Sequence, residues 1–166
     1  MNISFTIKSP SECSEDEIEK FIIFVSDGGE VTARGLKDRL MNAFYLAFIY
    51  EEDRLIGTAA LKIPDLSYRR RIESSSNVSL TEKHYPYELG WIYLTPNSRG
   101  NGYSYLLVSE LLKVTKNIGV FATSRIDNVA MHKTLIKLGF IEAGKEYGSK
   151  RGTHFLKLFK SNNTPN

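Results

Sequence analysis

Cysteine is almost absent from this sequence of 166 residues, and Cys13 is its single example. One cysteine cannot form an intrachain disulfide, so we expect a protein of a reducing compartment, for which the cytoplasm is the simplest choice. Histidine is scarce as well, and none of the three histidines lies beside another metal ligand at the spacing of a metal site. We therefore expect no metal. Because Cys13 lies far from the later motifs, we also expect no covalent intermediate on it.

Long apolar runs are missing too, since no stretch approaches the roughly 20 apolar residues that a membrane span needs. The opening residues, MNISFTIKSPSEC, lack the basic-then-apolar order of a signal peptide. The formal net charge of +3, from 22 basic and 19 acidic side chains, is too small to indicate nucleic acid by itself. We expect no membrane attachment, and one globular domain over residues 1–160 with a frayed tail at 161–166.

Hydrophobic patterning predicts elements in the order β-α-α-β-β-β-α-β-α-β-β. The expected strands are 3–8, 87–94, 119–125, 140–147 and 153–160, together with a hairpin over 44–63 that turns at 51–54. The expected helices are 14–29 with a capping box of Ser14 and Glu17, 30–43, one ending at 117, and 128–139 between Asn128 and Gly139. Residues 65–83 are polar, serine-rich and aperiodic, which indicates a long loop. This order predicts a mixed α/β sheet, antiparallel at first, with one crossover helix.

A glycine-containing turn joins a strand to a helix within YELGWIYLTPNSRGNGYSYLL, residues 87–107. Gly100 and Gly102 remove side chains at the start of the helix, where unpaired N–H groups and the helix dipole attract anions. Arg99 adds a cation and Ser104 a hydroxyl, so the turn is a candidate pyrophosphate site. It has no lysine for a P-loop, and Tyr105 replaces the third glycine of a dinucleotide fingerprint. The alternative is an ordinary strand-to-helix connection.

The turn closely resembles motif A of the GNAT superfamily of acyl-CoA N-acyltransferases, (Gln or Arg)-x-x-Gly-x-(Gly or Ala). Arg99, Gly102 and Ser104 stand at its defined positions, and Ser104 is a mild departure. The similarity extends from about residue 56 to 159 and includes NVAMHKTLIKLGF near its end. It implies a GNAT-like fold: a mixed, mainly antiparallel central sheet flanked by helices, with a splayed parallel strand pair that forms the acyl-CoA slot. It also implies an acetyltransferase that uses acetyl-CoA (coenzyme A) as co-substrate.

The resemblance further implies which residues hold the cofactor. The backbone of the strand would bind the pantetheine arm, and a bulge near the strand's end would open the slot. Backbone amides of the turn, with Arg99, would hold the pyrophosphate. Asn128 would lie near the pantetheine or the distal end of the cofactor; the alternative is helix capping alone, and one side chain could do both. The implied cofactor-binding set is Ile92, Tyr93, Leu94, Arg99, Gly100, Asn101, Gly102, Tyr103, Ser104 and Asn128.

Amide formation from a thioester requires a neutral amine and therefore a group that takes its proton. Glu88 is our candidate base, because its spacing to Gly102 matches that of the catalytic glutamate in GNAT histone acetyltransferases. The alternative is an exposed carboxylate at a strand end. The family often has a tyrosine that protonates the leaving thiolate, but Leu135 stands at that place and is also compatible with a core position. Substitute donors are Thr134, Ser124 and Tyr147, or the thiolate leaves unassisted.

The expected acceptor is a primary amine, on a small molecule, a protein or a peptide. A basic run, Arg69, Arg70 and Arg71, lies in the expected loop and is compatible with a tRNA contact. It keeps open a toxin-like enzyme that acetylates aminoacyl-tRNA, against the simpler reading of a solvated loop. The leucine at 135 keeps open a non-catalytic acyl-CoA-binding protein. We expect His132 on a helix surface, and a monomer or a homodimer.

Overall fold

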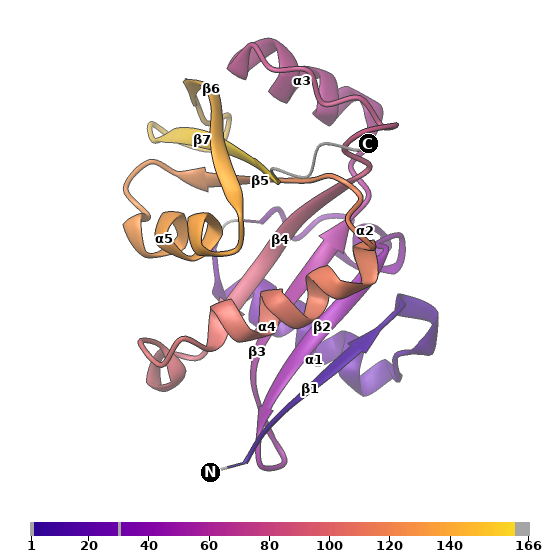
Figure 1. The fold of residues 1–166 in the computed structure, drawn as a ribbon. Helices are drawn as coiled ribbons and strands as arrows, with labels where there is room; N and C mark the ends of the chain where they lie inside the picture. Colours follow the sequence, from indigo (N-terminus) through magenta and orange to yellow (C-terminus); the bar gives the residue numbers. More distant parts are fainter. Residues whose placement is uncertain (1, 30, 162–166) are drawn as a thin grey trace. The chain divides into compact units, whose positions relative to one another are not determined.

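A computed structural model describes residues 2–29 and 31–161, and within them the strands hydrogen-bond in the order β1-β2-β3-β4-β5-β7-β6 (Figure 1). The sheet is mostly antiparallel, and β4 runs parallel to β5. Contacts divide the chain into two compact units. The first unit comprises Met1–Lys62 with Gly90–Val114, and the second comprises Ile63–Leu89 with Thr115–Asn166. Strand β4 contributes residues to both, and a single domain over 1–160 stays a prediction.

The fold class predicted from the sequence is confirmed, including its parallel strand pair. The strands are β1 Ile3–Lys8, β2 Tyr45–Glu51, β3 Arg54–Lys62, β4 Tyr87–Leu94, β5 Val120–Arg125, β6 Phe140–Gly148 and β7 Phe155–Ser161. The helices are α1 Glu15–Asp27, α2 Leu36–Met41, α3 Leu66–Ser76, α4 Tyr103–Leu112 and α5 Val129–Lys137. Short 3-10 turns occupy Pro10–Glu12, Pro96–Ser98 and Lys113–Thr115.

The first unit is a layer of strands β1 to β3 with helices on both faces. Leu46 and Phe48 of β2 are fully buried in a cluster with α1 and α2, where the Phe21 ring meets Phe48 edge-on at 5.6 Å. Alternation turns Ala47 and Ile49 to the opposite face, and both are fully buried too. Helix α4 contacts β1, β2 and β3, and crosses them in front in Figure 1. Packing against these strands thus fixes α4, and with it the first turn of that helix, relative to them.

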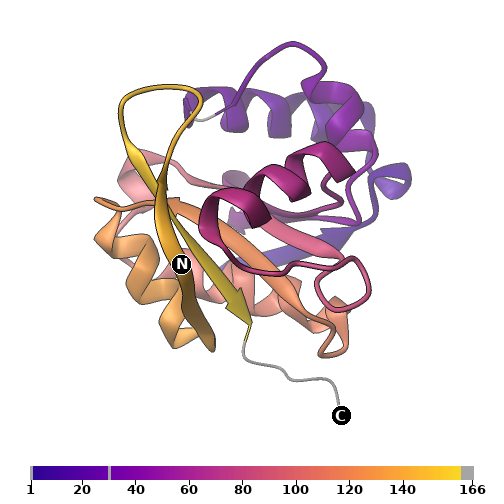
Figure 2. The same cartoon turned by 90° about the horizontal axis from the view of Figure 1, so that it is seen from above.

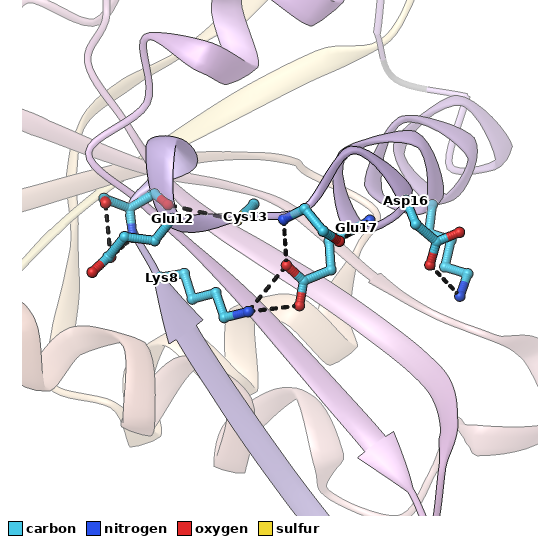
Figure 3. Close-up of polar contacts among 8 residues, drawn as sticks. Lys8, Glu12, Cys13, Asp16 and Glu17 are labelled. Carbon is cyan, nitrogen blue, oxygen red and sulfur yellow. Dashed lines mark hydrogen bonds and ion pairs between the residues drawn. The ribbon is translucent and has the colours of Figure 1, made fainter.

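An ion pair ties the end of β1 to the first turn of α1. The predicted capping box is present, because Ser14 accepts from the Glu17 backbone N–H and the Glu17 carboxylate accepts from that of Ser14. The same carboxylate lies 2.8 Å from the Lys8 ammonium (Figure 3). Burial raises the pKa of Glu17, but hydrogen bonds from Lys8 and Ser14 outweigh it and leave that pKa lowered. The hydrogen bond to Glu17 raises the pKa of Lys8.

We expect Lys8→Met to lower the free energy of unfolding by about 0.5–1 kcal/mol near neutral pH, the range for a partly exposed ion pair. A lowered carboxylate pKa contributes stability above its unfolded value, and this is lost as pH falls through the folded value. The difference between variant and wild type should therefore shrink in acid. Denaturant unfolding at several pH values measures it. Lys20→Met, which removes the more exposed pair with Asp16, is the control and should change stability less. A pH-independent difference for Lys8→Met would rule out the pair as its cause.

The second unit packs helices on both faces of β5, β7 and β6. On one face, Ile72 of α3 is buried with Phe121 and Leu158, and the α3 ribbon passes over these strands in Figure 2. On the other, the His132 ring of α5 lies 5.1 Å from that of Phe159. The prediction of a surface position for His132 is wrong, since it is 8% exposed and its Nε2 lies 2.8 Å from the Arg125 carbonyl oxygen. A histidine that satisfies a carbonyl can join an apolar face.

The predicted loop at 65–83 is wrong over its first half, which forms α3. Asp65 caps the helix by accepting from the Tyr68 N–H at 2.8 Å, and Asn77 ends it in a left-handed conformation. Its buried face consists of Arg69, Ile72 and Ser76. Two of these three residues are polar, so the segment lacks the apolar periodicity that predicts a helix. The Ser76 hydroxyl donates to the Ile72 carbonyl oxygen within the helix at 2.7 Å, whereas the Arg69 guanidinium depends on tertiary contacts with backbone carbonyls.

Several predicted boundaries also need correction. Helix α2 begins at Leu36 rather than Glu30, because Gly35 adopts a left-handed conformation with φ 72° just before it. Helix α4 ends at Leu112 instead of 117. Ser161 ends β7 rather than starting the tail, and the tail residues 162–166 lie outside the described part. Across the described ranges, none of the helices is long and apolar enough to cross a membrane.

Candidate active site

The glycine turn leaves open space at the start of α4, in the first unit. Gly100 has φ 81° and Gly102 has φ 75°, a backbone region that side chains disfavour. A Cβ built on either glycine would meet no atom within 4 Å. Helix α4 begins directly afterwards at Tyr103, so the N–H groups of its first turn lie at this opening, where a helix has no internal partners for them. The turn can therefore receive an anion against bare backbone.

Arg99 is braced against the end of β4. Its Nε donates to the Leu94 carbonyl oxygen at 3.0 Å, and its guanidinium lies 5.5 Å from the centroid of the Tyr93 ring. The Asn101 side-chain amide donates to the Ser98 and Arg99 carbonyl oxygens, each at 3.3 Å. These bonds fix the turn onto the strand and hold a permanent cation beside it.

Strand β4 is kinked at Trp91, which is not glycine yet has φ 50°. Its ring packs 6.2 Å from Phe21 of α1, its carbonyl accepts from the Thr58 hydroxyl at 3.4 Å, and the Lys62 ammonium lies 5.0 Å from the ring centroid. These contacts hold a conformation that costs a bulky residue about 1–3 kcal/mol. The kink interrupts the extended strand just before Ile92, in the region where the sequence predicted a bulge.

The three residues expected to bind pantetheine follow this kink. Ile92 and Tyr93 are half-buried, and Leu94 is nearly buried. The Tyr93 ring meets that of Phe24 from α1 edge-on at 5.3 Å, which anchors the strand end within the first unit. Cofactor binding by their backbone stays a prediction, and so does a slot between β4 and β5.

Glu88 is buried in the second unit. It is 3% exposed and pairs with Phe121 where β4 runs parallel to β5. The Tyr68 hydroxyl of α3 donates to its Oε1 at 3.2 Å. The alternative of an exposed strand-end carboxylate is therefore wrong. A buried carboxylate with a fixed hydroxyl donor is the environment in which proton-transfer groups are found, although structural roles share it.

Two tyrosines lie within electrostatic reach of Glu88. Burial, and then the Glu88 charge, raise the pKa of Tyr68 far above its ordinary value. The same two causes raise the pKa of Tyr147 of β6, while Arg71 opposes them. Both hydroxyls therefore stay protonated and can donate. Tyr147 is among the proton donors that the sequence predicts, whereas Tyr68 is not, because it lies in a segment that the sequence predicts to be a loop.

The other candidate residues have structural contacts. Asn128 caps α5, its Oδ1 accepting from the Met131 N–H at 3.1 Å, so the capping role is confirmed and a cofactor contact stays a prediction. Leu135 is 1% exposed, which confirms its place in the core. The Thr134 hydroxyl donates to the Ala130 carbonyl oxygen at 3.1 Å within its own helix. The Ser124 hydroxyl lies 3.5 Å from the Arg125 carbonyl oxygen.

The described residues provide neither a reactive cysteine nor a metal-binding cluster. Burial, with a smaller contribution from the Glu17 charge, raises the pKa of Cys13 to about 11, so the thiolate needed for nucleophilic attack is scarce at neutral pH. Within residues 2–29 and 31–161, no three histidine, cysteine, aspartate or glutamate side chains cluster so that they could hold a metal ion.

The family model of the Acetyltransferase (GNAT) family matches residues 11–140, more than half of the chain. The chain belongs to the GNAT family. The match spans the kinked strand, the glycine turn, helix α4 and helix α5, so the features described above lie inside the shared domain. Among curated protein sequences, none matches this GNAT chain.

Solved structures of similar fold are numerous. An acyl-CoA N-acyltransferase from Pseudomonas aeruginosa is 12% identical over 96% of this chain and 99% of its own, with a TM-score of 0.67. The ribosomal-protein-S18-alanine N-acetyltransferase of Escherichia coli is 13% identical over 98% and 96%, with a TM-score of 0.68. A ribosomal-protein-alanine N-acetyltransferase from Brucella melitensis is 18% identical over 94% and 98%, with a TM-score of 0.66. At these identities the likeness shows the fold.

Proposed function

We propose that this GNAT protein is an N-acetyltransferase that transfers the acetyl group of acetyl-CoA to a primary amine by direct attack in a ternary complex. The observation that carries the proposal is the open glycine turn at the start of α4, where both glycines are left-handed and a Cβ on either would meet no atom within 4 Å. A pyrophosphate is the anion that family membership predicts for this opening. A cytoplasmic location fits acetyl-CoA chemistry and remains a prediction.

The residues present suit this co-substrate. The amides of residues 100–104 and the Arg99 guanidinium would bind its phosphates. The backbone of Ile92, Tyr93 and Leu94 would bond to the pantetheine arm as an added strand would, since β4 leaves its regular course at Trp91. Asn128 remains a candidate contact in addition to its cap.

Glu88 is the proposed general base. The amine nitrogen attacks the thioester carbonyl carbon, its proton passes to the Glu88 carboxylate directly or through water, and the C–S bond then breaks. A backbone N–H near Tyr93 or Leu94 would stabilise the oxyanion. The departing sulfur needs little help, because a thiol with a pKa of about 8.5 is a fair leaving group. Tyr147 remains a candidate proton donor if one acts, and burial and the Glu88 charge raise its pKa and so weaken it as an acid.

The acceptor is a primary amine on a small molecule, a protein or a peptide. Two of the similar structures are named for acetylation of ribosomal-protein alanine, which makes peptide N-termini the first acceptors to test. A tRNA contact through the three consecutive arginines is disfavoured, because Arg69 is 2% exposed and bonds to backbone carbonyls. A non-catalytic acyl-CoA-binding protein is the second candidate, and the burial of Leu135 at the place of the family's tyrosine favours it.

Calorimetry with acetyl-CoA and with coenzyme A tests binding, and release of free thiol with a panel of amines tests turnover. We expect dissociation constants between about 1 μM and 1 mM, the usual range for enzyme substrates. Thiol release should depend on an amine from the panel, which includes peptides with a free N-terminus and small polyamines. Binding without thiol release would support the non-catalytic candidate. If neither acetyl-CoA nor coenzyme A gives a heat of binding, the proposed function is overturned.

A further inference from the structure

A buried arginine clamps the segment that leads into β4. Arg69 of α3 donates through Nη1 to the carbonyl oxygens of Leu80 at 2.6 Å and Tyr85 at 2.7 Å, and through Nη2 to that of Pro86 at 3.3 Å. Its guanidinium also lies 5.6 Å from the centroid of the Phe121 ring. Burying a guanidinium is costly unless its donors are satisfied. Here backbone carbonyls accept from Nη1 and Nη2, while the buried Nε has no hydrogen-bond partner among the described residues. The clamp fixes the backbone that immediately precedes Glu88.

The residue beside the clamp reaches Glu88 itself. Tyr68 directly precedes Arg69, and its own N–H is held by the Asp65 cap at 2.8 Å. Its hydroxyl donates to Glu88 Oε1 at 3.2 Å, while the Arg71 guanidinium lies 5.2 Å from the centroid of its ring. The first turn of α3 thus holds both the backbone before Glu88 and the carboxylate of Glu88.

We propose that Tyr68 is a positioning residue that keeps the Glu88 carboxylate oriented for its role as the base. This rests on the proposed function, and it assigns a role in the reaction to α3, a segment that the sequence predicts to be a loop. In this unit the titratable and charged groups near Glu88 and its tyrosines include Tyr68 and Arg71 of α3 and Tyr147 of β6. Thr123 of β5 hydrogen-bonds to Tyr68.

The physical reason lies in what burial does to a carboxylate. Loss of water disfavours its charged form, whereas a hydrogen bond to the charged form favours it. The Tyr68 hydroxyl donates such a bond to the Glu88 carboxylate. Because the hydroxyl is neutral, it does not oppose proton uptake by the carboxylate as a neighbouring cation would. Burial and the neighbouring carboxylate both keep Tyr68 protonated, so the donor persists across the working pH range.

Tyr68→Phe removes this donor and keeps the ring. The matched control is Tyr85→Phe, since that hydroxyl donates instead to the Ser161 carbonyl oxygen at 3.4 Å in the same unit. The first readout does not need turnover: the carboxyl-carbon NMR signal of Glu88 is followed against pH in both variants, assigned by its loss in Glu88→Gln. We expect its titration to move to higher pH in Tyr68→Phe and to stay in place in Tyr85→Phe. An unmoved titration in Tyr68→Phe overturns the proposal.

The second readout is the pH profile of kcat/KM with the amine that supports thiol release. A hydrogen bond to a charged group corresponds to a factor of about ten or more, so Tyr68→Phe should lose about tenfold on the acid side and recover as pH rises. Adding Tyr68→Phe to Glu88→Gln should cost little more, because Tyr68 acts through the carboxylate. A uniform loss at every pH, or an additive loss in the double variant, would mean that Tyr68 has only a structural role.

The two proposals fail separately. Normal activity of Glu88→Gln across pH would remove Glu88 as the base and leave the NMR result to describe a structural pair. Impaired Glu88→Gln together with a wild-type Tyr68→Phe would retain the base and reject Tyr68 as its positioning residue.

Discussion

Replacing Gly102 by valine should abolish measurable binding of coenzyme A and acetyl-CoA. The present glycine leaves nothing within 4 Å of where a Cβ would stand, so the new side chain would fill the volume assigned to the pyrophosphate. The substitution also carries a backbone cost, because φ is 75° and valine strongly disfavours that region. Calorimetry with coenzyme A and with acetyl-CoA measures the effect, and we expect the affinity to fall by at least about 100-fold.

Backbone strain must be separated from obstruction of the cradle. Gly139 offers the matched control, because it also has a positive φ, 92°, and open surroundings, and it belongs to the second unit rather than to the turn. Gly139→Val should lower stability by a similar amount, about 1–3 kcal/mol, and leave cofactor affinity unchanged. If Gly102→Val keeps wild-type affinity while folded, the phosphates bind elsewhere and the glycine turn is a simple connection.

Glu88→Gln should reduce turnover by about 100-fold or more near neutral pH, the usual contribution of a general base. The loss should be greatest at low pH, where the amine is protonated and needs a base, and smaller at high pH, where free amine is abundant. Cofactor affinity should be unchanged, because Glu88 lies outside the turn. Glutamine is nearly isosteric and can still accept from the Tyr68 hydroxyl, so we expect the fold to persist.

Initial rates across pH, with calorimetry beside them, measure this prediction. Glu142→Gln is the control, an exposed carboxylate of β6 in the same unit that pairs with Lys157 at 3.1 Å, and it should keep the wild-type profile. Should Glu88→Gln instead follow the wild-type profile, another group takes the proton. Equal losses in both variants would indicate a general effect of charge on the second unit.

The features that the sequence predicted well depend on nearby residues. The capping box of Ser14 and Glu17, the cap by Asn128 and the left-handed Gly139 all lie where their residue types predicted. Each involves hydrogen bonds or backbone preferences within a few positions of the chain, so residue identity and spacing are sufficient. The glycine turn belongs to the same class, since only glycine adopts its conformation without strain.

The predictions that failed concern polar residues whose environment is set from afar. Arg69 looked like part of a solvated run, but its donors meet carbonyls up to 17 positions along the chain. His132 looked like a surface residue, but a carbonyl seven positions away satisfies it inside the unit. Polar side chains are normally exposed, and no pattern of residue types shows which of them will find buried partners.

The sequence alone determined where an anion can meet bare backbone, because glycine positions and helix caps are properties of neighbouring residues. Tertiary structure alone decided the state of the proposed base: Glu88 is buried, and its hydroxyl donor lies 20 positions earlier on a helix that has no apolar period. The physical reason is that backbone conformation is encoded locally. The solvation of a carboxylate instead depends on every element that packs around it.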